Sequence, residues 1–364
     1  MFVVFMKNLL RGLWCQFHSA IAKFGGAVRA KDHPRVWYGG ARGGSKAGAH
    51  TKLRYLSARF PQHISRFNIV YLFSNARFLS PSALANLKRR NVPVLLNQNG
   101  VFYPAWHPEG WESRNREMAY AYHAADYVIW QSEFCRQSAN KFLGTRKREG
   151  KVIYNAVDTQ KFTPATSSKS GPKTFLITGN ISDDVFYRLE LALKAFALAL
   201  PELQSARLIF AGLLSTENLQ QANRICEALR VDDNVEFQGP YSHDEAPVIY
   251  HQADVYVMLK HNDPCPNVVL EAMASGLAII YSNSGGVPEL VGENAGIALA
   301  VEHRFDKVST PKPEAIAGAM VEIMDGLQTR QANARQRAVA NFDIVDWLDQ
   351  HNILMNDFLG KYGA

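Results

Sequence analysis

The sequence predicts two α/β domains, each a doubly wound parallel sheet, which face each other across a cleft and follow an N-terminal amphipathic helix. Three observations predict this fold class. The 364 residues suffice for two domains with cores of ordinary size. Short apolar strands alternate with amphipathic helices in two successive series, as in parallel sheets with helices on both faces. Residues 163–172, rich in Ser, Thr, Lys and Pro, are typical of a linker between the series.

The first 24 residues predict the amphipathic helix, because at about 100° per residue their side chains separate into two faces. The apolar face gathers Phe2, Val3, Met6, Leu9, Leu10, Leu13, Trp14, Phe17, Ala20, Ile21 and Phe24, and the polar face gathers Lys7, Asn8, Arg11, Gln16, His18, Ser19 and Lys23. Such a helix can lie in a membrane interface. It can also pack on the protein's own surface, and both interpretations stay open, with the basic charge of the adjacent residues favouring the membrane.

The first series of elements occupies residues 35–154. We expect strands at residues 35–38, 69–73, 92–97, 127–131 and 152–154, with helices between them, the first near residues 47–60. A glycine-rich turn, residues 39–44, separates the first strand from that helix.

The second series follows the linker. We expect strands at residues 174–178, 207–211, 235–238, 255–259 and 278–281, and helices near residues 187–199, 216–229, 244–252 and 267–274. Two such Rossmann-like series place the carboxyl ends of their strands along a cleft, where open α/β sheets bind ligands. A helical tail, residues 313–359, covers the outside.

The distribution of charge points to an anionic partner of the first domain. Residues 1–90 contain 16 Lys and Arg but a single acid, Asp32, whereas the rest of the chain contains 24 bases and 32 acids. An acidic membrane surface or a phosphorylated acceptor fits this asymmetry. We expect no nucleic-acid partner, because no helix-turn-helix, zinc-finger or aromatic RNA-binding motif accompanies the charge.

Composition excludes several other classes. With 47% hydrophobic and 20% charged residues, the chain has the balance of a globular protein, and no apolar run approaches the roughly 18 residues of a membrane span. The N-terminus lacks the pattern of a secretory signal. The four cysteines show no Cys-x-x-Cys spacing, which argues against a zinc site and against a disulfide framework. We therefore expect a cytoplasmic protein, peripheral on the inner face of a membrane if the helix binds lipid.

The most informative segment begins at Asp263 and continues through Glu271 to Gly285, Gly286 and Glu289. A loop enters a helix near residue 267, so free backbone N–H groups form an anion site, to which the helix field contributes about 0.3–1 kcal/mol per charge. Glu271, about one turn inside the helix, can accept two ribose hydroxyls, at about 1.5–3 kcal/mol for each charged hydrogen bond. Asp263 can accept hydrogen bonds from the hydroxyls of the group that is attached to the phosphates.

This segment resembles the retaining glycosyltransferases of family 4, which have the GT-B fold. Their motif is an acid, seven residues, a glutamate, Ala-x-Ala-x-Gly and a later Gly-Gly-x-x-Glu, and here Asp replaces the usual first Glu. The resemblance implies that Glu271 binds the donor ribose and that Asp263 acts on the transferred sugar. It also implies that the sugar and its diphosphate are held at the loop and first helical turn, formed by Pro266, Asn267, Val268 and Val269. The segment Asn155-Ala-Val-Asp158 is similar to the family's Asn-Gly-Val-Asp at the domain junction.

The chain departs from the family where the donor diphosphate is neutralised. The family places Arg after the glycine that ends the second domain's first strand, but here Asn180 follows Gly179. The family's Lys position falls on Tyr187 or, with one gap, on Arg188. We expect Arg188 to bind phosphate, and Lys260 is a second candidate for the missing charge. In the first domain, Gly44 corresponds to the family's Gly-Gly turn against the donor phosphates, although a plain tight turn explains it equally.

The resemblance implies a retaining hexosyltransferase that moves a sugar from a nucleoside-diphosphate sugar to a hydroxyl of a glycan or lipid-linked anionic acceptor, as in polysaccharide biosynthesis. It implies no cofactor and no metal, and the sequence has no Asp-x-Asp motif. The domains would be a basic helix (1–30), an acceptor-binding domain (31–160), a nucleotide-sugar-binding domain (161–340) and a C-terminal helix that packs back toward the first domain (341–364). The alternatives are a catalytically silent nucleotide-sugar-binding or scaffold protein, favoured by Asn180 and Tyr187, and a GT-B epimerase or phosphorylase.

Overall fold

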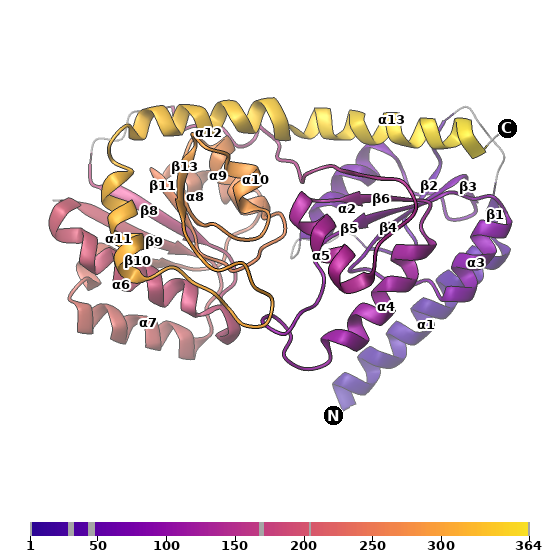
Figure 1. The fold of residues 1–364 in the computed structure, drawn as a ribbon, viewed down its shortest axis with the longest axis horizontal. Coiled ribbons are helices and arrows are strands. Elements are labelled where there is room, and N and C mark those ends of the chain that lie inside the picture. The colour runs from indigo at the N-terminus through magenta and orange to yellow at the C-terminus, as the bar shows by residue number, and fades with distance from the viewer. Residues whose placement is uncertain (1, 28–32, 43–47, 167–170, 204, 363–364) are drawn as a thin grey trace. The chain divides into compact units, whose positions relative to one another are not determined.

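The computed structural model of the chain describes all residues except 1, 28–32, 43–47, 167–170, 204 and 363–364 (Figure 1). The chain forms two compact units. Unit 1 consists of Met1–Tyr154 and Val345–Ala364, and unit 2 of Asn155–Ile344. The division at 154/155 lies six residues before the expected boundary, and the last 20 residues return to unit 1. Each unit has its own parallel sheet, as predicted.

Unit 1 contains a five-stranded parallel sheet whose strands are neighbours in the order of the sequence. Its strands are β2 (Val36–Trp37), β4 (Ile69–Phe73), β5 (Val94–Gln98), β6 (Tyr127–Trp130) and β7 (Gly150–Val152). A two-stranded sheet, β1 (Gly26–Ala27) with β3 (Arg66–Phe67), lies apart. Every residue of β4 and β5 is buried, as expected for parallel strands covered on both faces.

Two helices of unit 1 begin at a serine whose side chain caps them. The helices described in this unit are α1 (Phe2–Phe24), α2 (Gly48–Arg59), α3 (Pro81–Arg89), α4 (Trp111–Ala124), α5 (Glu133–Leu143) and α13 (Ile344–Tyr362). The hydroxyl of Ser80 accepts the N–H of Ala83 at the start of α3, and Ser132 caps α5 in the same way. The fully buried His351 of α13 lies 3.0 Å from the hydroxyl of Tyr71, which joins the last helix to β4.

Helix α1 forms over the residues expected, and the described part of its apolar face points mostly away from the unit, the orientation that the membrane interpretation requires. It packs on α3 with His18, Ser19 and Ala22 buried. Buried His18 and Ser19 belong to the predicted polar face, although Arg11, Gln16 and Lys23 of that face are exposed. Apolar side chains such as Leu13 and Phe17 are exposed.

Unit 2 contains a six-stranded parallel sheet in the order β10-β9-β8-β11-β12-β13. Its strands are β8 (Lys173–Thr178), β9 (Ala206–Ala211), β10 (Val235–Gln238), β11 (Val255–Met258), β12 (Ala278–Ser282) and β13 (Gly296–Leu299). The chain builds outward from β8 to one edge and then returns to place β11 on its other side. This is the doubly wound order, and its switch point lies between β8 and β11, where such sheets bind ligands.

Seven α-helices in the described part of unit 2 connect and cover these strands. They are α6 (Tyr187–Leu203), α7 (Thr216–Leu229), α8 (Ala246–His251), α9 (Asn267–Ala274), α10 (Val287–Val291), α11 (Pro313–Glu322) and α12 (Leu327–Phe342). Two 3₁₀ turns, Asp183–Val185 and Asp232–Asn234, precede α6 and β10. Fully buried Phe175, Leu193 and Phe210 lie in a core shared by the sheet, α6 and α11.

Candidate functional site

The predicted residues of the second domain meet at the switch point of the unit 2 sheet. Gly179 directly follows β8, and Lys260 follows β11 by two residues. Gly179 adopts a φ of +111°, and Gly212, which follows β9, adopts a φ of +153°. A Cβ atom on Gly212 would lie 1.9 Å from the carbonyl oxygen of Gly179, so only glycine allows these two strand ends to approach. Asn180 is exposed beside them.

The loop after β11 fixes Asp263 by bonds to both its side chain and its backbone. The carboxylate Oδ2 accepts from the Lys260 ammonium at 2.9 Å, and Oδ1 accepts the N–H of Cys265 at 3.3 Å. The carbonyl oxygen of Asp263 accepts the N–H of Gly286 at 2.9 Å. A Cβ on Gly285, whose φ is +67°, would lie 2.3 Å from that oxygen. The Gly-Gly turn of the motif thus holds the acidic loop against the start of α10.

Asn155, at the start of unit 2, supports the same loop. Its side-chain Nδ2 donates to the carbonyl oxygen of Cys265 at 2.7 Å, and its backbone N–H points at the Cys265 sulfur at 3.4 Å. The structure thereby gives the Asn155-Ala-Val-Asp158 segment a physical role, because it ties the chain entering unit 2 to the loop that carries Asp263.

The N-terminus of α9 provides backbone donors next to this loop. Pro266 is the N-cap residue and makes no side-chain cap, so the first helical N–H groups have no partner within the helix. Asn267 and Val268 are half-buried, and the Oδ1 atom of Asn267 is buried without a hydrogen-bond partner. Val269 is fully buried and its N–H donates to the Pro266 oxygen at 3.2 Å. Of the four predicted residues, Asn267 and Val268 are therefore the ones that can present N–H groups to an anion.

Glu271 is a buried carboxyl group, 9% exposed, on the second turn of α9. The hydroxyl of Tyr250 donates to its Oε2 atom at 2.9 Å, and the Nε2 atom of His243 lies 3.8 Å from Oε1. Burial raises the pKa of Glu271 to about 7, against the opposing effects of the Tyr250 hydrogen bond and the Lys161 charge. A ligand whose hydroxyl groups donate hydrogen bonds to this carboxylate would replace the hydrogen bonds to water that burial has removed.

Three residues around Glu271 are absent from the sequence prediction: Lys161, His243 and Tyr250. The Lys161 ammonium lies 3.1 Å from Nδ1 of His243 and pairs with Asp244. His243 belongs to the segment that follows β10, and polar residues after a parallel strand are a signal that could have placed it at this edge of the sheet. Tyr250 gave no such signal, because a tyrosine in an amphipathic helix is indistinguishable from a packing residue.

The side chain of Arg188, in the first turn of α6, reaches the end of β8, whereas that of Tyr187 points to the loop after β11. The Arg188 side chain is 5% exposed, and its Nη2 atom lies 3.5 Å from the Thr178 oxygen. Its Nε atom is buried without a hydrogen-bond partner. The Tyr187 hydroxyl instead accepts the backbone N–H of His261 at 2.9 Å and supports the loop after β11. Burial raises the pKa of Tyr187, while the nearby charges of Arg188 and Lys260 lower it, so cationic groups gather at the switch point.

The remaining predictions lie outside this arrangement. Gly44, the predicted phosphate contact of the first domain, lies outside the described residues. Among the residues that the structure describes, no group of three or more His, Cys, Asp or Glu could hold a metal ion. Within that part of the chain, none of the helices has the length and apolar character required to cross a membrane.

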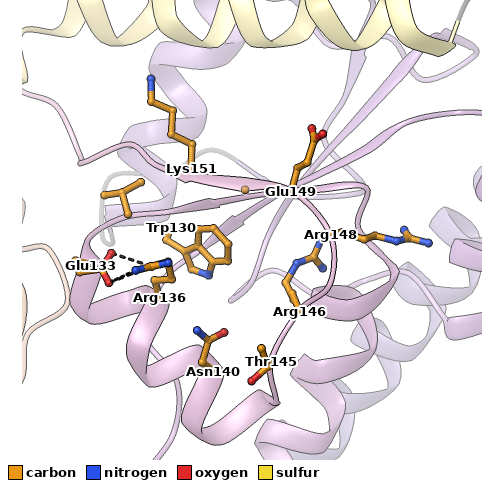
Figure 2. A pocket seen from close by; sticks show the side chains of 11 residues that line it. Trp130, Glu133, Arg136, Asn140, Thr145, Arg146, Arg148, Glu149 and Lys151 are labelled. Atoms are coloured by element: carbon orange, nitrogen blue, oxygen red, sulfur yellow. Dashed lines mark hydrogen bonds and ion pairs between the residues drawn. The ribbon is translucent and has the colours of Figure 1, made fainter.

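Unit 1 has a cavity of about 500 Å³ between α5 and β7 that contains several arginines (Figure 2). Arg136 is engaged there by both carboxylate oxygens of Glu133. Arg146 donates to the carbonyl oxygens of Tyr122 and Ala125, at the end of α4. These arginines neutralise a carboxylate and cap a helix, so we assign them a structural role and no part in the site of unit 2.

Comparison with known proteins identifies the family. Residues 16–161 match the model of Glycosyltransferase Family 4, and residues 158–337 match that of Glycosyl transferases group 1. The chain belongs to glycosyltransferase family 4.

This glycosyltransferase family 4 member is similar to several curated proteins. It is 27% identical over 227 residues to a glycogen synthase of Mycobacterium tuberculosis. This alignment covers 60% of this chain and 51% of that protein. It is 25% identical over 211 residues to the D-inositol 3-phosphate glycosyltransferase of Mycolicibacterium smegmatis, covering 54% of this chain and 48% of the relative. The chain thus spans about half the length of these relatives.

Solved structures establish the GT-B fold. Anabaena HepE in complex with UDP and glucose superposes with a TM-score of 0.69 at 16% identity, covering 89% of this chain and all of that one. Sucrose-phosphate synthase from Thermosynechococcus elongatus superposes with a TM-score of 0.64 at 18% identity, covering 85% and 77%. At these identities the likeness shows the fold alone.

Proposed function

We propose that this chain is a retaining glycosyltransferase that moves a hexosyl group from a nucleoside-diphosphate sugar to a hydroxyl of a glycan or lipid-linked acceptor. One observation carries the proposal: the buried carboxyl of Glu271 and the carboxylate of Asp263 flank the open N-terminus of α9 at the switch point of the sheet. Along this site an acid is followed by free N–H groups and then by a second acid. A nucleotide sugar has a matching order: a sugar, then a diphosphate, then a ribose.

The groups of unit 2 divide the ligand between them. The N–H groups of Asn267 and Val268 would hold the diphosphate, with Arg188 and Lys260 balancing its charge. Glu271 would accept the ribose hydroxyls, and Asp263 would orient the transferred sugar. Support for a nucleotide-sugar donor comes from Anabaena HepE, whose structures contain UDP-glucose or UDP with glucose.

The proposed reaction needs no covalent intermediate with the protein. The acceptor oxygen attacks the anomeric carbon from the face that the diphosphate leaves, so the new C–O bond forms on the side where the old one breaks. A phosphate oxygen takes the acceptor proton. The protein positions both partners and stabilises the departing diphosphate. We propose that Arg188, Lys260 and the α9 N–H groups do this without a metal ion, so excess EDTA should leave transfer unchanged.

Thermal stability in the presence of UDP-, GDP-, ADP- and TDP-sugars tests the proposal. A donor at a hundredfold excess over its dissociation constant stabilises the folded state by about 2.7 kcal/mol. We expect one donor to raise the melting temperature of the wild type and of Glu217→Ala, whose glutamate is exposed on α7, but not of Glu271→Ala. No response to any donor would contradict the proposal.

The rival function is a catalytically silent nucleotide-sugar-binding or scaffold protein, which Asn180 favours because it stands where the family has arginine. The buried Arg188 at the end of β8 favours the enzyme. Incubation with the stabilising donor and a panel of acceptors distinguishes them: transferred or hydrolysed sugar supports a transferase, a changed sugar nucleotide indicates an epimerase, and an unchanged donor indicates a binding protein.

A further inference from the structure

Helix α1 presents five of its described leucine and phenylalanine side chains to solvent. Leu10 is 59% exposed, Phe17 56% and Phe24 85%, whereas His18 and Ser19 are 2% and 9% exposed. The exposed stripe, hereafter the apolar stripe, also includes Leu9 and Leu13, which are 48% and 54% exposed. A contiguous run of exposed leucine and phenylalanine is costly in water and marks a surface that binds an apolar partner.

Directional bonds fix α1 in this orientation, so the stripe cannot turn inward without breaking them. The Trp14 indole donates to the carbonyl oxygen of Gly40 at 2.9 Å, and the backbone N–H of Ser80 donates to the Ser19 hydroxyl at 3.1 Å. The Arg90 guanidinium donates to the carbonyl oxygens at the C-terminal end of the helix, including that of Ala22 at 3.0 Å. These bonds, to the Ser19 hydroxyl, to backbone carbonyl oxygens and from the Trp14 indole, hold α1 with the apolar stripe pointing away from the unit.

Exposed cations stand on the same helix as the apolar stripe. Exposed Lys23 lies in the last turn of α1, and exposed Arg11 lines a hollow of about 260 Å³ beside the helix. The hollow has a largely apolar lining that includes Phe78 and Leu84, and a second arginine, Arg77. Burial lowers the pKa of Arg77, and the charges of Arg11 and a third arginine lower it further, although Glu117 lies 3.7 Å away. Additional anions would relieve this repulsion.

The charge around α1 identifies the partner. Residues 1–90 carry 16 Lys and Arg against one acid. Two copies of such a surface would repel each other if their stripes met. An anionic bilayer offers both an apolar phase for the leucines and phenylalanines and phosphates for the cations.

We propose that unit 1 docks on the surface of an anionic phospholipid bilayer through α1, with the apolar stripe in the interface and exposed Lys and Arg of the same unit on the lipid phosphates. This partner goes beyond the proposed reaction, because the donor site lies in unit 2 and binds its ligand in solution. Docking would bring the chain to acceptors that are themselves anchored in the membrane.

Vesicle flotation of the full chain tests the proposal. Vesicles of phosphatidylcholine with phosphatidylglycerol should bind the protein, and vesicles of phosphatidylcholine alone should not. Leu13→Gln/Phe17→Gln keeps the charge and should lower the partition coefficient about tenfold or more. Lys23→Gln should lower it about fivefold, the factor that corresponds to about 1 kcal/mol per cation at an anionic surface.

A matched control is the pair Leu198→Gln/Val248→Gln, which alters side chains that are 51% and 64% exposed on helices of unit 2. It should bind vesicles like the wild type. Melting temperature and donor binding check that each variant is folded, and they separate this proposal from the proposed function, because vesicle binding requires no donor. Deletion of the helix is less informative, since it removes the buried Ala22 and His18.

Three outcomes would overturn the proposal. Equal binding to both kinds of vesicle would remove the role of charge. Unchanged binding of Leu13→Gln/Phe17→Gln would remove the role of the apolar stripe. A dimer in sedimentation equilibrium that the same substitution dissociates, together with an absence of vesicle binding, would show that a second copy covers the stripe.

Discussion

Replacing Glu271 with glutamine should remove a loss of stability that unit 2 otherwise suffers as the pH rises, and should weaken its affinity for the donor. The carboxyl is 9% exposed, and burial raises its pKa from 4.5 to about 7. The folded state therefore holds this proton more tightly than the unfolded state does. The free energy of unfolding falls as the pH rises from about 4.5 to about 7, and the full cost is present above that range.

The size of the effect follows from the two pKa values. The difference between 4.5 and about 7 corresponds to about 3 kcal/mol, which the neutral amide avoids. The amide oxygen of glutamine can still accept the Tyr250 hydroxyl. Its two N–H donors add a burial cost of about 1–3 kcal/mol that does not depend on pH. The pH dependence of the difference between variant and wild type is therefore the quantity to measure.

Scanning calorimetry of the unliganded wild type and variant at about pH 5 and about pH 8 measures this pH dependence. About 2.5 kcal/mol of the change falls between these conditions, so the melting temperature of unit 2 in Glu271→Gln, relative to wild type, should rise by about 5–10 °C, since about 1 kcal/mol shifts a domain of this size by about 2–4 °C. Donor affinity should fall about 10- to 150-fold for each charged hydrogen bond lost. A difference in melting temperature that stays constant with pH would refute the buried, pH-sensitive carboxyl.

Three further predictions follow from the packing. Tyr250→Phe removes the hydroxyl that donates to the buried glutamate and should cost about 1–3 kcal/mol in urea unfolding; an unchanged midpoint would contradict the hydrogen bond. Gly285→Ala places a Cβ 2.3 Å from the Asp263 oxygen at a φ of +67° and should lower stability by more than about 1 kcal/mol, unlike the open position Gly239→Ala. Burial lowers the pKa of His351 to about 4, so unit 1 should lose up to about 3 kcal/mol as the pH falls from 6.5 to 4; His351→Gln should abolish this dependence, and an identical acid profile would argue against it.

The sequence predicts most of the fold because its strands appear as short apolar runs and its helices as amphipathic segments in regular alternation. The loop that carries Asp263 and the start of α9 are also predictable, since glycines, a proline and two acids stand at fixed spacing along one short segment. The burial and the hydrogen-bond partners of Glu271 cannot be predicted from the sequence. Its hydroxyl donor, Tyr250, is 21 residues away, and His243 is further still. Only the folded chain brings these side chains together and removes the water that keeps a carboxyl acidic.

Helix α1 shows a different limit of sequence reasoning. A helical wheel separates its apolar and polar faces correctly, but it does not say which face the protein covers. The usual assumption buries the apolar face. Here the Ser80 N–H bonds to the Ser19 hydroxyl, and Arg90 bonds to backbone carbonyl oxygens at the end of the helix, so that α1 is held with its apolar stripe outward. The bonded residues lie 61 and 65–68 residues apart in the chain.

The return of the C-terminal helix to unit 1 constrains the order in which the protein can assemble during synthesis. Unit 2 is continuous in sequence, from Asn155 to Ile344, and the ribosome can release it as a complete domain. Unit 1 is not complete until α13 is translated, because His351 and Phe358 supply contacts to Tyr71 and Tyr127 of its sheet. Strands β4 and β6 must therefore wait, incompletely covered, while the whole of unit 2 is synthesised and until α13 has emerged.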